Sequence, residues 1–397
     1  MDWQRELREL AAAIGSHVRR GANALERLVD QDPYHIVGYR GYGSRNQVLL
    51  LGRVLQNEGL ALPDPAHSKL RNLLAMLKRI ESDPLPHARV RVRLGAREDE
   101  LAADDEGFLR GWLDAGEFPA GWGTIHLELL QSEHEAPITG IAPILVPPAS
   151  AEYGVISDMD DTVLQSSVTN FIRAARLTLL ENARTRLPFP GVAGFYRALA
   201  AGSTGTAGNP IFYVSSSPWN FYDVIADFLE VQQIPAGPLL LRNWDIGPSL
   251  LQNAPHKSEY IAEILATYPA LPFILVGDST QEDPEIYADI VAANAPRILA
   301  VYIRNVKPHP ERTRSIRELA QRVEAAGSTL VLADDTLAAA SHAAAHGWIR
   351  HALLPEVREE KSADEGDGGK AASPGVEKSE PVPTVVVDPT LNAAELE

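Results

Sequence analysis

The chain reads YGVISDMDDTV over residues 153–163, and this stretch carries most of the information about the fold. Its first five residues, Tyr153–Ser157, are mostly apolar, as in a short buried strand. Three acidic residues, Asp158, Asp160 and Asp161, follow within four positions. Charges this close repel one another by roughly 1–4 kcal/mol, so their clustering calls for a chemical reason.

Downstream of this stretch, short apolar runs alternate with helical patterns. Further strands are expected at Ile211–Ser215, Phe273–Gly277, Ile298–Ile303 and Thr329–Leu332. Helices are expected at Phe195–Ala201, Trp219–Val231, Ser258–Tyr268, Pro284–Ala293, Glu311–Ala326 and Leu337–His346. Continuous apolar strands separated by helices indicate a parallel sheet covered on both faces, so the predicted fold class is α/β.

Ligands of such sheets bind at the carboxyl ends of the strands, where this chain places polar residues. Ser215 ends the second apolar strand, and Lys257 precedes the third. The third strand is followed by Asp278 and, five positions later, Asp283. Carboxylates, a hydroxyl and an ammonium are therefore expected at one edge of the sheet.

The carboxylates favour a bound cation. Residues two apart in extended backbone point the same way, so Asp158 and Asp160 are expected to converge. Asp278 joins them if its strand is adjacent. Clustered carboxylates either share protons or hold a hard cation, and Mg²⁺ fits several oxygens in a polar loop. A solvated acidic turn or an isolated calcium loop is the plainer alternative, and the hydroxyl, lysine and second acidic loop in this chain order argue against it.

The same residues resemble the four motifs of the haloacid-dehalogenase superfamily of phosphatases, in order. The longer matches are DMDDTV at residues 158–163, PFPGV at 188–192, YVSSSPWN at 213–220 and GDSTQEDPEIY at 277–287. Together they resemble one branch, the actin-patch-associated phosphatidate phosphatase family. The resemblance covers about residues 150–330. Ser216 departs from the asparagine often expected at its position, which bears on substrate detail.

The resemblance implies a Rossmann-like parallel sheet of haloacid-dehalogenase type and a Mg²⁺-dependent phosphatase. Asp158 is implied to be the nucleophile, forming an aspartyl phosphate, and Asp160 the general acid and base as well as a metal ligand through its carbonyl. Ser215 and Lys257 are implied to bind the phosphoryl group, while Asp158 and Asp278 hold the metal. Asp283 is counted with the metal residues and either contacts the metal through water or orients Lys257. Thr162 is counted with the substrate-binding residues and is expected to fix the loop by a backbone hydrogen bond.

The regions outside residues 149–355, the phosphatase domain, are expected to be accessory. Residues 1–32 are expected to form an amphipathic helix, which packs on the next domain or lies on an anionic membrane. Period-two patterns, together with a helix near Ala66–Ile80, predict a small antiparallel β-domain over 33–148. Residues 356–397 hold 11 acidic and 4 basic residues and little apolar periodicity, which predicts a disordered acidic tail.

Composition excludes several classes of function. The chain of 397 residues has no cysteine, which rules out disulfides and thiolate-bound metals. A net charge of −17 argues against a nucleic-acid partner. There is no long apolar run and no secretory layout at the N-terminus, so a cytoplasmic protein, with peripheral contact to a membrane at most, is expected.

Three functional readings follow. The first is a phosphatase of phosphatidate, supported by the resemblance and by the lack of room for a large lid domain. The second keeps the chemistry but takes a soluble phosphomonoester. The third is a binding protein with a vestigial hydrolase core, which the intact Asp158, Asp160, Lys257 and Asp278 argue against. Trp219 is a candidate for the rim of an open site, with simple packing as the alternative.

Overall fold

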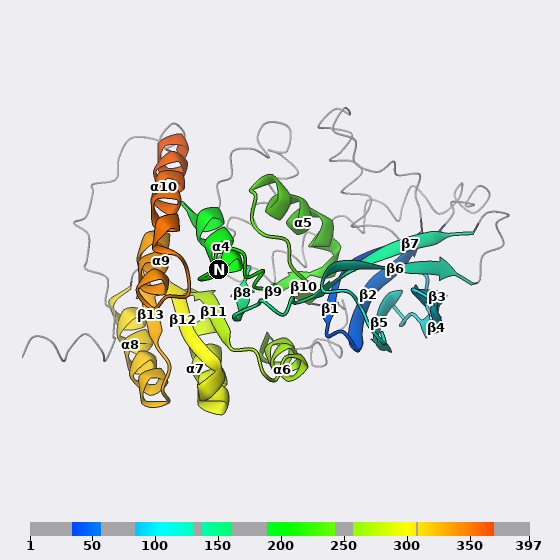
Figure 1. Cartoon of the computed structure of the whole chain (residues 1–397), viewed down its shortest axis with the longest axis horizontal. Helices are drawn as coiled ribbons and strands as arrows, with labels where there is room; N and C mark the ends of the chain where they lie inside the picture. The colour runs from blue at the N-terminus through cyan, green and yellow to red at the C-terminus, as the bar shows by residue number, and fades with distance from the viewer. Residues whose placement is uncertain are drawn as a thin grey trace, which may run out of the picture.

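The computed structural model describes residues 34–56, 84–130, 137–159, 189–242, 257–306 and 309–368. These residues form a seven-stranded and a six-stranded sheet that lie side by side (Figure 1). The helices expected over residues 1–32 and Ala66–Ile80 lie outside the described residues. Among the described helices, none has the length and apolar character needed to span a bilayer.

Buried and exposed side chains alternate in two strands of the first sheet, Arg89–Leu94 and Gly121–Leu129. Its strands are β1 (Tyr34–Gly43), β2 (Gln47–Gln56), β3 (Arg89–Leu94), β4 (Arg97–Ala102), β5 (Phe108–Asp114), β6 (Gly121–Leu129) and β7 (Thr139–Val146). Their order is β4-β3-β6-β7-β1-β2-β5, and only the β1–β7 pair is parallel. A Cβ atom placed on Gly111 of β5 would lie 2.8 Å from Leu101 of β4, so the two edge strands approach and the sheet curls towards a barrel.

The second sheet is parallel throughout. Its strands are β8 (Gly154–Asp158), β9 (Ile211–Pro218), β10 (Leu239–Arg242), β11 (Phe273–Asp278), β12 (Ile298–Arg304) and β13 (Leu330–Ala333). The order is β10-β9-β8-β11-β12-β13. The chain moves outwards from β8 to β10 and then returns to β11 beside β8, so the strand order reverses between these two strands. Ligands of open parallel sheets bind at such a reversal.

Helices cover both faces of this parallel sheet. They are α4 (Val192–Ala201), α5 (Tyr222–Val231), α6 (Lys257–Thr267), α7 (Asp283–Asn294), α8 (Pro310–Ala325), α9 (Thr336–Ala345) and α10 (Leu354–Gly368), with 3₁₀ turns η2 (Trp219–Phe221), η3 (Ala295–Arg297) and η4 (His351–Leu353). Figure 1 places α4, α5 and α10 above the strands and α6, α7 and α8 below them. The predicted α/β class, with a parallel sheet preceded by a mainly antiparallel one, is confirmed at this level.

The start of the acidic tail corrects the sequence analysis. Disorder was predicted from residue 356, but α10 continues to Gly368 and packs against α9 and α4. Val357 is fully buried, and Lys361 Nζ donates to Asp335 Oδ2 of the α9 N-cap at 2.6 Å. This helix is held by one buried valine and a few ion pairs. Its sequence therefore has too little apolar periodicity to predict a helix. Residues 369–397 lie outside the described part.

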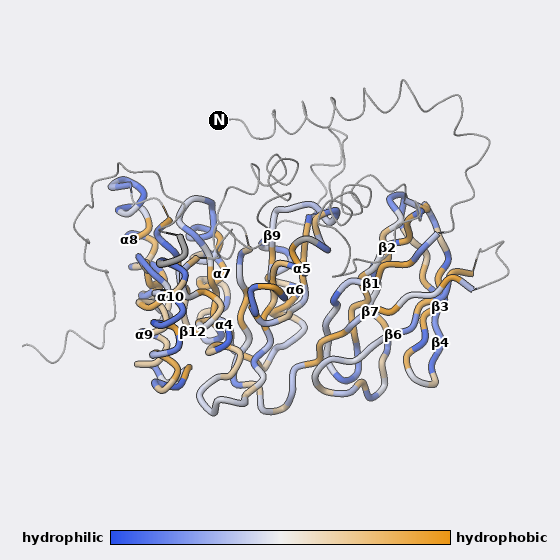
Figure 2. Tube along the Cα trace, turned by 90° about the horizontal axis from the view of Figure 1, so that it is seen from above, coloured by the Kyte–Doolittle hydropathy of each residue, from blue (hydrophilic) through white to orange (hydrophobic). Residues whose placement is uncertain are grey.

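The two sheets share one hydrophobic core. Tyr39 of β1 stacks on Trp219 of η2 with ring centroids 4.9 Å apart, and Phe108 of β5 lies 6.0 Å from the same ring. Polar contacts reinforce this joint: Arg40 N donates to Tyr222 Oη at 2.7 Å. A second core lies within the first sheet alone. Figure 2 shows hydrophobic residues along β2 and β7 and hydrophilic ones along β4 at the outer edge.

Candidate active site

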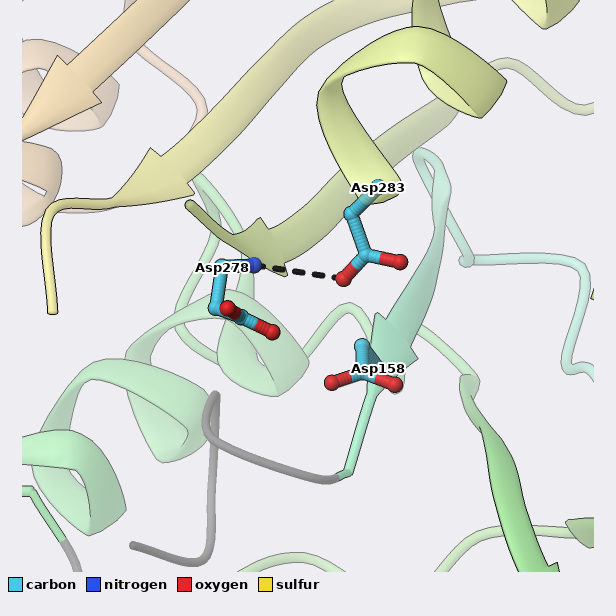
Figure 3. Close-up of side chains that lie close together, drawn as sticks. All are labelled: Asp158, Asp278 and Asp283. Atoms are coloured by element: carbon cyan, nitrogen blue, oxygen red, sulfur yellow. Dashed lines mark hydrogen bonds between the residues drawn. The ribbon is translucent and has the colours of Figure 1, made fainter. Parts of the chain in front are cut away.

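Two adjacent parallel strands end in aspartate at the point where the strand order reverses. Asp158 is the last residue of β8, and Asp278 is the last residue of β11. Asp283 begins α7 after a four-residue loop. Each of the three carboxylates has an oxygen within 4.8 Å of the others, and all three residues are fully buried (Figure 3). The expected convergence of Asp158 with Asp278 is therefore observed.

Lys257 lies between two of these carboxylates. It is the first residue of α6, and its Nζ donates to Asp158 Oδ1 at 2.7 Å and also to Asp283 Oδ1. Burial lowers the pKa of Lys257, but the charges and hydrogen bonds of Asp158 and Asp283 raise it more, so the net pKa lies above the ordinary value. The ammonium therefore stays charged throughout the physiological pH range.

Backbone contacts fix the acidic loop. The Asp278 N–H donates to Asp283 Oδ2 at 3.2 Å, so both oxygens of Asp283 have partners on the protein. The N–H of Thr280 donates to Asp278 Oδ1 at 2.5 Å, and the Thr280 hydroxyl donates to the same oxygen. Figure 3 shows the Asp278 and Asp283 side chains facing the end of β8.

Gly277 makes this close approach possible. A Cβ atom there would lie 2.6 Å from Asp283 Oδ2 and 2.8 Å from the ring of Tyr287, contacts that real side chains essentially never make. Any larger residue would push Asp283 away from β11. The glycine of the GDSTQED stretch is thus a packing requirement of the carboxylate cluster.

Ser215 lies at the same edge of the sheet. Asp158 is the register partner of Val214 on β9, so Ser215 lies one residue beyond that pairing. Its side chain is nearly buried, at 4% exposure, and its Oγ accepts a hydrogen bond from Ser217 N at 2.9 Å. Because β9 continues to Pro218, this contact lies inside the strand, close to a register shift in its pairing with β10.

The structure brings Asp158, Lys257, Asp278 and Asp283 together and sets Ser215 at the same edge. Asp160 and Thr162 lie outside the described residues. Trp219, a candidate for the rim, instead packs in the joint between the sheets, at 6% exposure. Sequence reasoning missed Arg312, which contacts the acidic loop. No local motif marks it, because it is one of four arginines in α8.

A known family model matches the part of the chain that carries this site. Residues 153–305 match the family model described as the catalytic domain of phosphatidate phosphatase APP1. The resemblance predicted from the four motifs is confirmed. All seven predicted site residues lie inside the matched range.

Two curated relatives match the same part of the chain. Phosphatidate phosphatase APP1 of Saccharomyces cerevisiae is 30% identical over 179 residues, which is 43% of this chain and 30% of that protein. An uncharacterized protein of Schizosaccharomyces pombe is 26% identical over 189 residues, 44% of this chain and 30% of that protein. The chain thus spans about a third of the length of each relative.

The solved structures are more distant. A carbohydrate acetylesterase from Xanthomonas citri is 13% identical and covers 72% of this chain and 73% of its own, with a TM-score of 0.26. That score is too low to indicate a shared fold.

Proposed function

We propose that this protein is a Mg²⁺-dependent phosphatase that acts through an aspartyl phosphate on Asp158 and hydrolyses phosphatidate to diacylglycerol and phosphate. The observation that carries the proposal is the buried cluster of three carboxylates and one ammonium at the carboxyl edge of the sheet. This cluster lies within the residues that match the phosphatidate phosphatase catalytic domain. The strand order, with its reversal beside β8, supports a haloacid-dehalogenase type of fold.

The donor set fits a hard divalent cation. Carboxylate oxygens are the ligands that Mg²⁺ prefers, and three buried carboxylates outnumber the single ammonium beside them. Asp158 and Asp278 would hold the ion, with the carbonyl of Asp160 as the ligand that the family resemblance adds. When bound, the ion supplies the positive charge that allows a carboxylate to approach a phosphoryl dianion.

Asp283 is proposed to act mainly by orientation. Its two carboxylate oxygens accept hydrogen bonds from Lys257 and from the Asp278 backbone. These contacts favour orientation of Lys257 and the loop over direct metal ligation, with any contact to the ion running through water.

The residues divide the chemistry into two displacements. Asp158 forms a bond to phosphorus as the bond to the leaving alkoxide breaks, and Asp160 gives that alkoxide a proton. Water then attacks phosphorus, loses a proton to Asp160 and releases phosphate, which restores the Asp158 carboxylate. Lys257 and Ser215 would hold the non-bridging phosphoryl oxygens as charge shifts onto them.

Phosphatidate is proposed as the substrate because of the family model and the yeast relative, both described as phosphatidate phosphatase. Such a substrate requires the site to reach a lipid surface, so we propose a cytoplasmic protein with peripheral membrane contact. The acidic net charge of −17 makes a local basic face necessary for that contact.

The test is phosphate release from phosphatidate in mixed micelles at fixed Mg²⁺, with a panel of soluble phosphomonoesters beside it. Asp158→Asn should lower kcat by at least about a thousandfold, since it removes the nucleophile. Asp289→Asn is the matched control, because Asp289 lies on the surface of α7 in an exposed ion pair with Arg322. Hydrolysis of soluble esters alone would replace the lipid substrate, and absence of any metal-dependent turnover would refute the enzyme.

A further inference from the structure

We propose that Arg312 is a positioning residue, which holds the loop from Asp278 to Asp283 in the form that binds a divalent cation. The proposal rests on the proposed function only in taking this loop as the metal loop. Arg312 lies in the first turn of α8, an element that carries none of the predicted site residues.

Every nitrogen of the Arg312 guanidinium donates to the acidic loop or to the start of α7. Its Nε donates to the Ser279 carbonyl at 2.8 Å, and its Nη2 donates to the Gln281 carbonyl at 2.6 Å. The guanidinium also forms a bidentate ion pair with Glu285: Nη2 donates to Oε2 at 2.9 Å, and Nη1 donates to Oε1. One side chain therefore joins the middle of the loop to the first turn of the following helix.

The two carbonyl contacts of Arg312 fall, in sequence, between Asp278 and Asp283 of the carboxylate cluster. Ser279 directly follows Asp278, and Gln281 lies two positions before Asp283. Without a metal ion, the carboxylates of Asp158, Asp278 and Asp283 repel one another, and the single Lys257 ammonium offsets only part of that repulsion, which favours opening of the loop. The planar guanidinium of Arg312 opposes this opening because its donors are fixed in place and hold several acceptors at once, which the single ammonium of a lysine does not do.

A second arginine of the same helix provides the contrast. Arg322 lies near the end of α8 and pairs with Asp289 of α7 at 3.1 Å, with both side chains largely exposed. The two arginines thus link the same pair of helices, but only Arg312 reaches the loop. A purely structural role for Arg312 predicts that both arginines affect stability alone.

The experiment measures Mn²⁺ binding to the full chain, as free Mn²⁺ detected by electron paramagnetic resonance, without substrate. Arg312→Gln should weaken Mn²⁺ binding about 10- to 100-fold, the usual effect of losing a partner that orients metal ligands. Arg322→Gln should leave the affinity within about twofold of wild type. Arg312→Lys should bind nearly as weakly as Arg312→Gln, because lysine keeps the charge but loses the fork.

The activity assay separates positioning from stability. At raised Mg²⁺ the kcat of Arg312→Gln should return towards the wild-type value, while the half-saturating Mg²⁺ concentration stays raised. If Arg312→Gln does not fold, Glu285→Gln removes the carboxylate that pairs with Arg312 and should weaken Mn²⁺ binding several-fold.

Unchanged Mn²⁺ affinity in a folded Arg312→Gln or Glu285→Gln variant overturns this proposal and leaves the proposed function in place. Wild-type protein that binds Mn²⁺ but releases no phosphate refutes the proposed function. Weakened Mn²⁺ binding in Arg312→Gln then still supports the positioning role of Arg312. Wild-type protein that binds no Mn²⁺ overturns both.

Discussion

At the edge of the parallel sheet, the ammonium of Lys257 lies between Asp158 and Asp283, and all three side chains are almost completely removed from water. Burying two carboxylates next to each other is costly, and a shared cation offsets part of that cost. The same ammonium is the group proposed to hold the phosphoryl oxygens. Lys257 therefore contributes both to folding stability and to the proposed phosphoryl binding. Changing the ions in solution separates these two contributions.

Lys257→Met should reduce the unfolding free energy by about 3–5 kcal/mol in the presence of a chelator, the usual effect of leaving a buried charge without its partner. Adding Mg²⁺ should restore part of that loss, because the ion supplies positive charge to the same carboxylates. Urea unfolding with and without Mg²⁺ measures both effects. The control is Arg97→Met, whose exposed pair with Asp114 should be worth at most about 1 kcal/mol. A Lys257→Met loss no larger than the control would contradict the prediction.

At the scale of elements, α10 is joined to α9 by the ion pair of Lys361 with Asp335, and to α4 by the ion pairs of its glutamates with Arg197. Asp335 caps α9 by accepting a hydrogen bond from Ala338 N at 2.8 Å, and its other oxygen accepts from Lys361 of α10. Burial raises the pKa of Asp335, but the bonds from Lys361 and the helix amides lower it more, so the net pKa is below the ordinary value. One carboxylate thus serves as helix cap and as anchor for the next helix.

Asp335→Ala should reduce the unfolding free energy by about 0.5–2 kcal/mol at pH 7, the usual effect of losing an N-cap. The carboxylate is more acidic in the folded state, so its contribution is present above the unfolded-state pKa of about 4. The contribution is lost as the pH falls through the lower folded-state value. Urea unfolding at pH 7 and at pH 3 checks the sign. Asp335→Asn, which can still cap the helix, should lose less, and a deficit that grows in acid would refute this account.

The order of the motifs predicted the parallel sheet and the residues at its edge, because each motif directly follows or precedes an apolar run. Short or exposed elements escaped prediction. The strand β10 has only four residues, and β4 (REDELA) lacks apolar alternation because it is exposed and pairs its charges with the arginines of β3. Arg312 escaped for another reason: its contacts depend on how α8 packs beside α7, and that packing leaves no mark in the local sequence.

At the scale of the whole molecule, aromatic side chains from both sheets pack in one core, and we expect the two sheets to unfold together. Trp219 directly follows β9, the strand that carries Ser215, and β1 and β5 of the first sheet cover its ring. The helix that carries Lys257 is bound from the same side, since Glu263 pairs with Arg110 at 2.5 Å and accepts from Tyr42 Oη at 3.2 Å. The first sheet thus supports two segments that bear predicted site residues.

Calorimetry should therefore show a single unfolding transition whose calorimetric and van't Hoff enthalpies agree. Trp219→Ala should reduce the unfolding free energy by about 3–5 kcal/mol and lower the temperature of that one transition. Trp122→Ala, which alters a tryptophan 43% exposed on β6, should change it far less. Two separate transitions, with Trp219→Ala shifting only one, would show that the sheets unfold independently.

The same joint has a practical consequence for anyone who produces the hydrolase portion by itself. A recombinant fragment starting near residue 149 would leave Trp219, Tyr222 and Tyr268 facing solvent where Tyr39 and Gly43 now cover them. Such a truncation would expose an aggregation-prone aromatic surface and favour the formation of inclusion bodies. Soluble material should require β1, β2 and β5 to be retained or those aromatic positions to be redesigned.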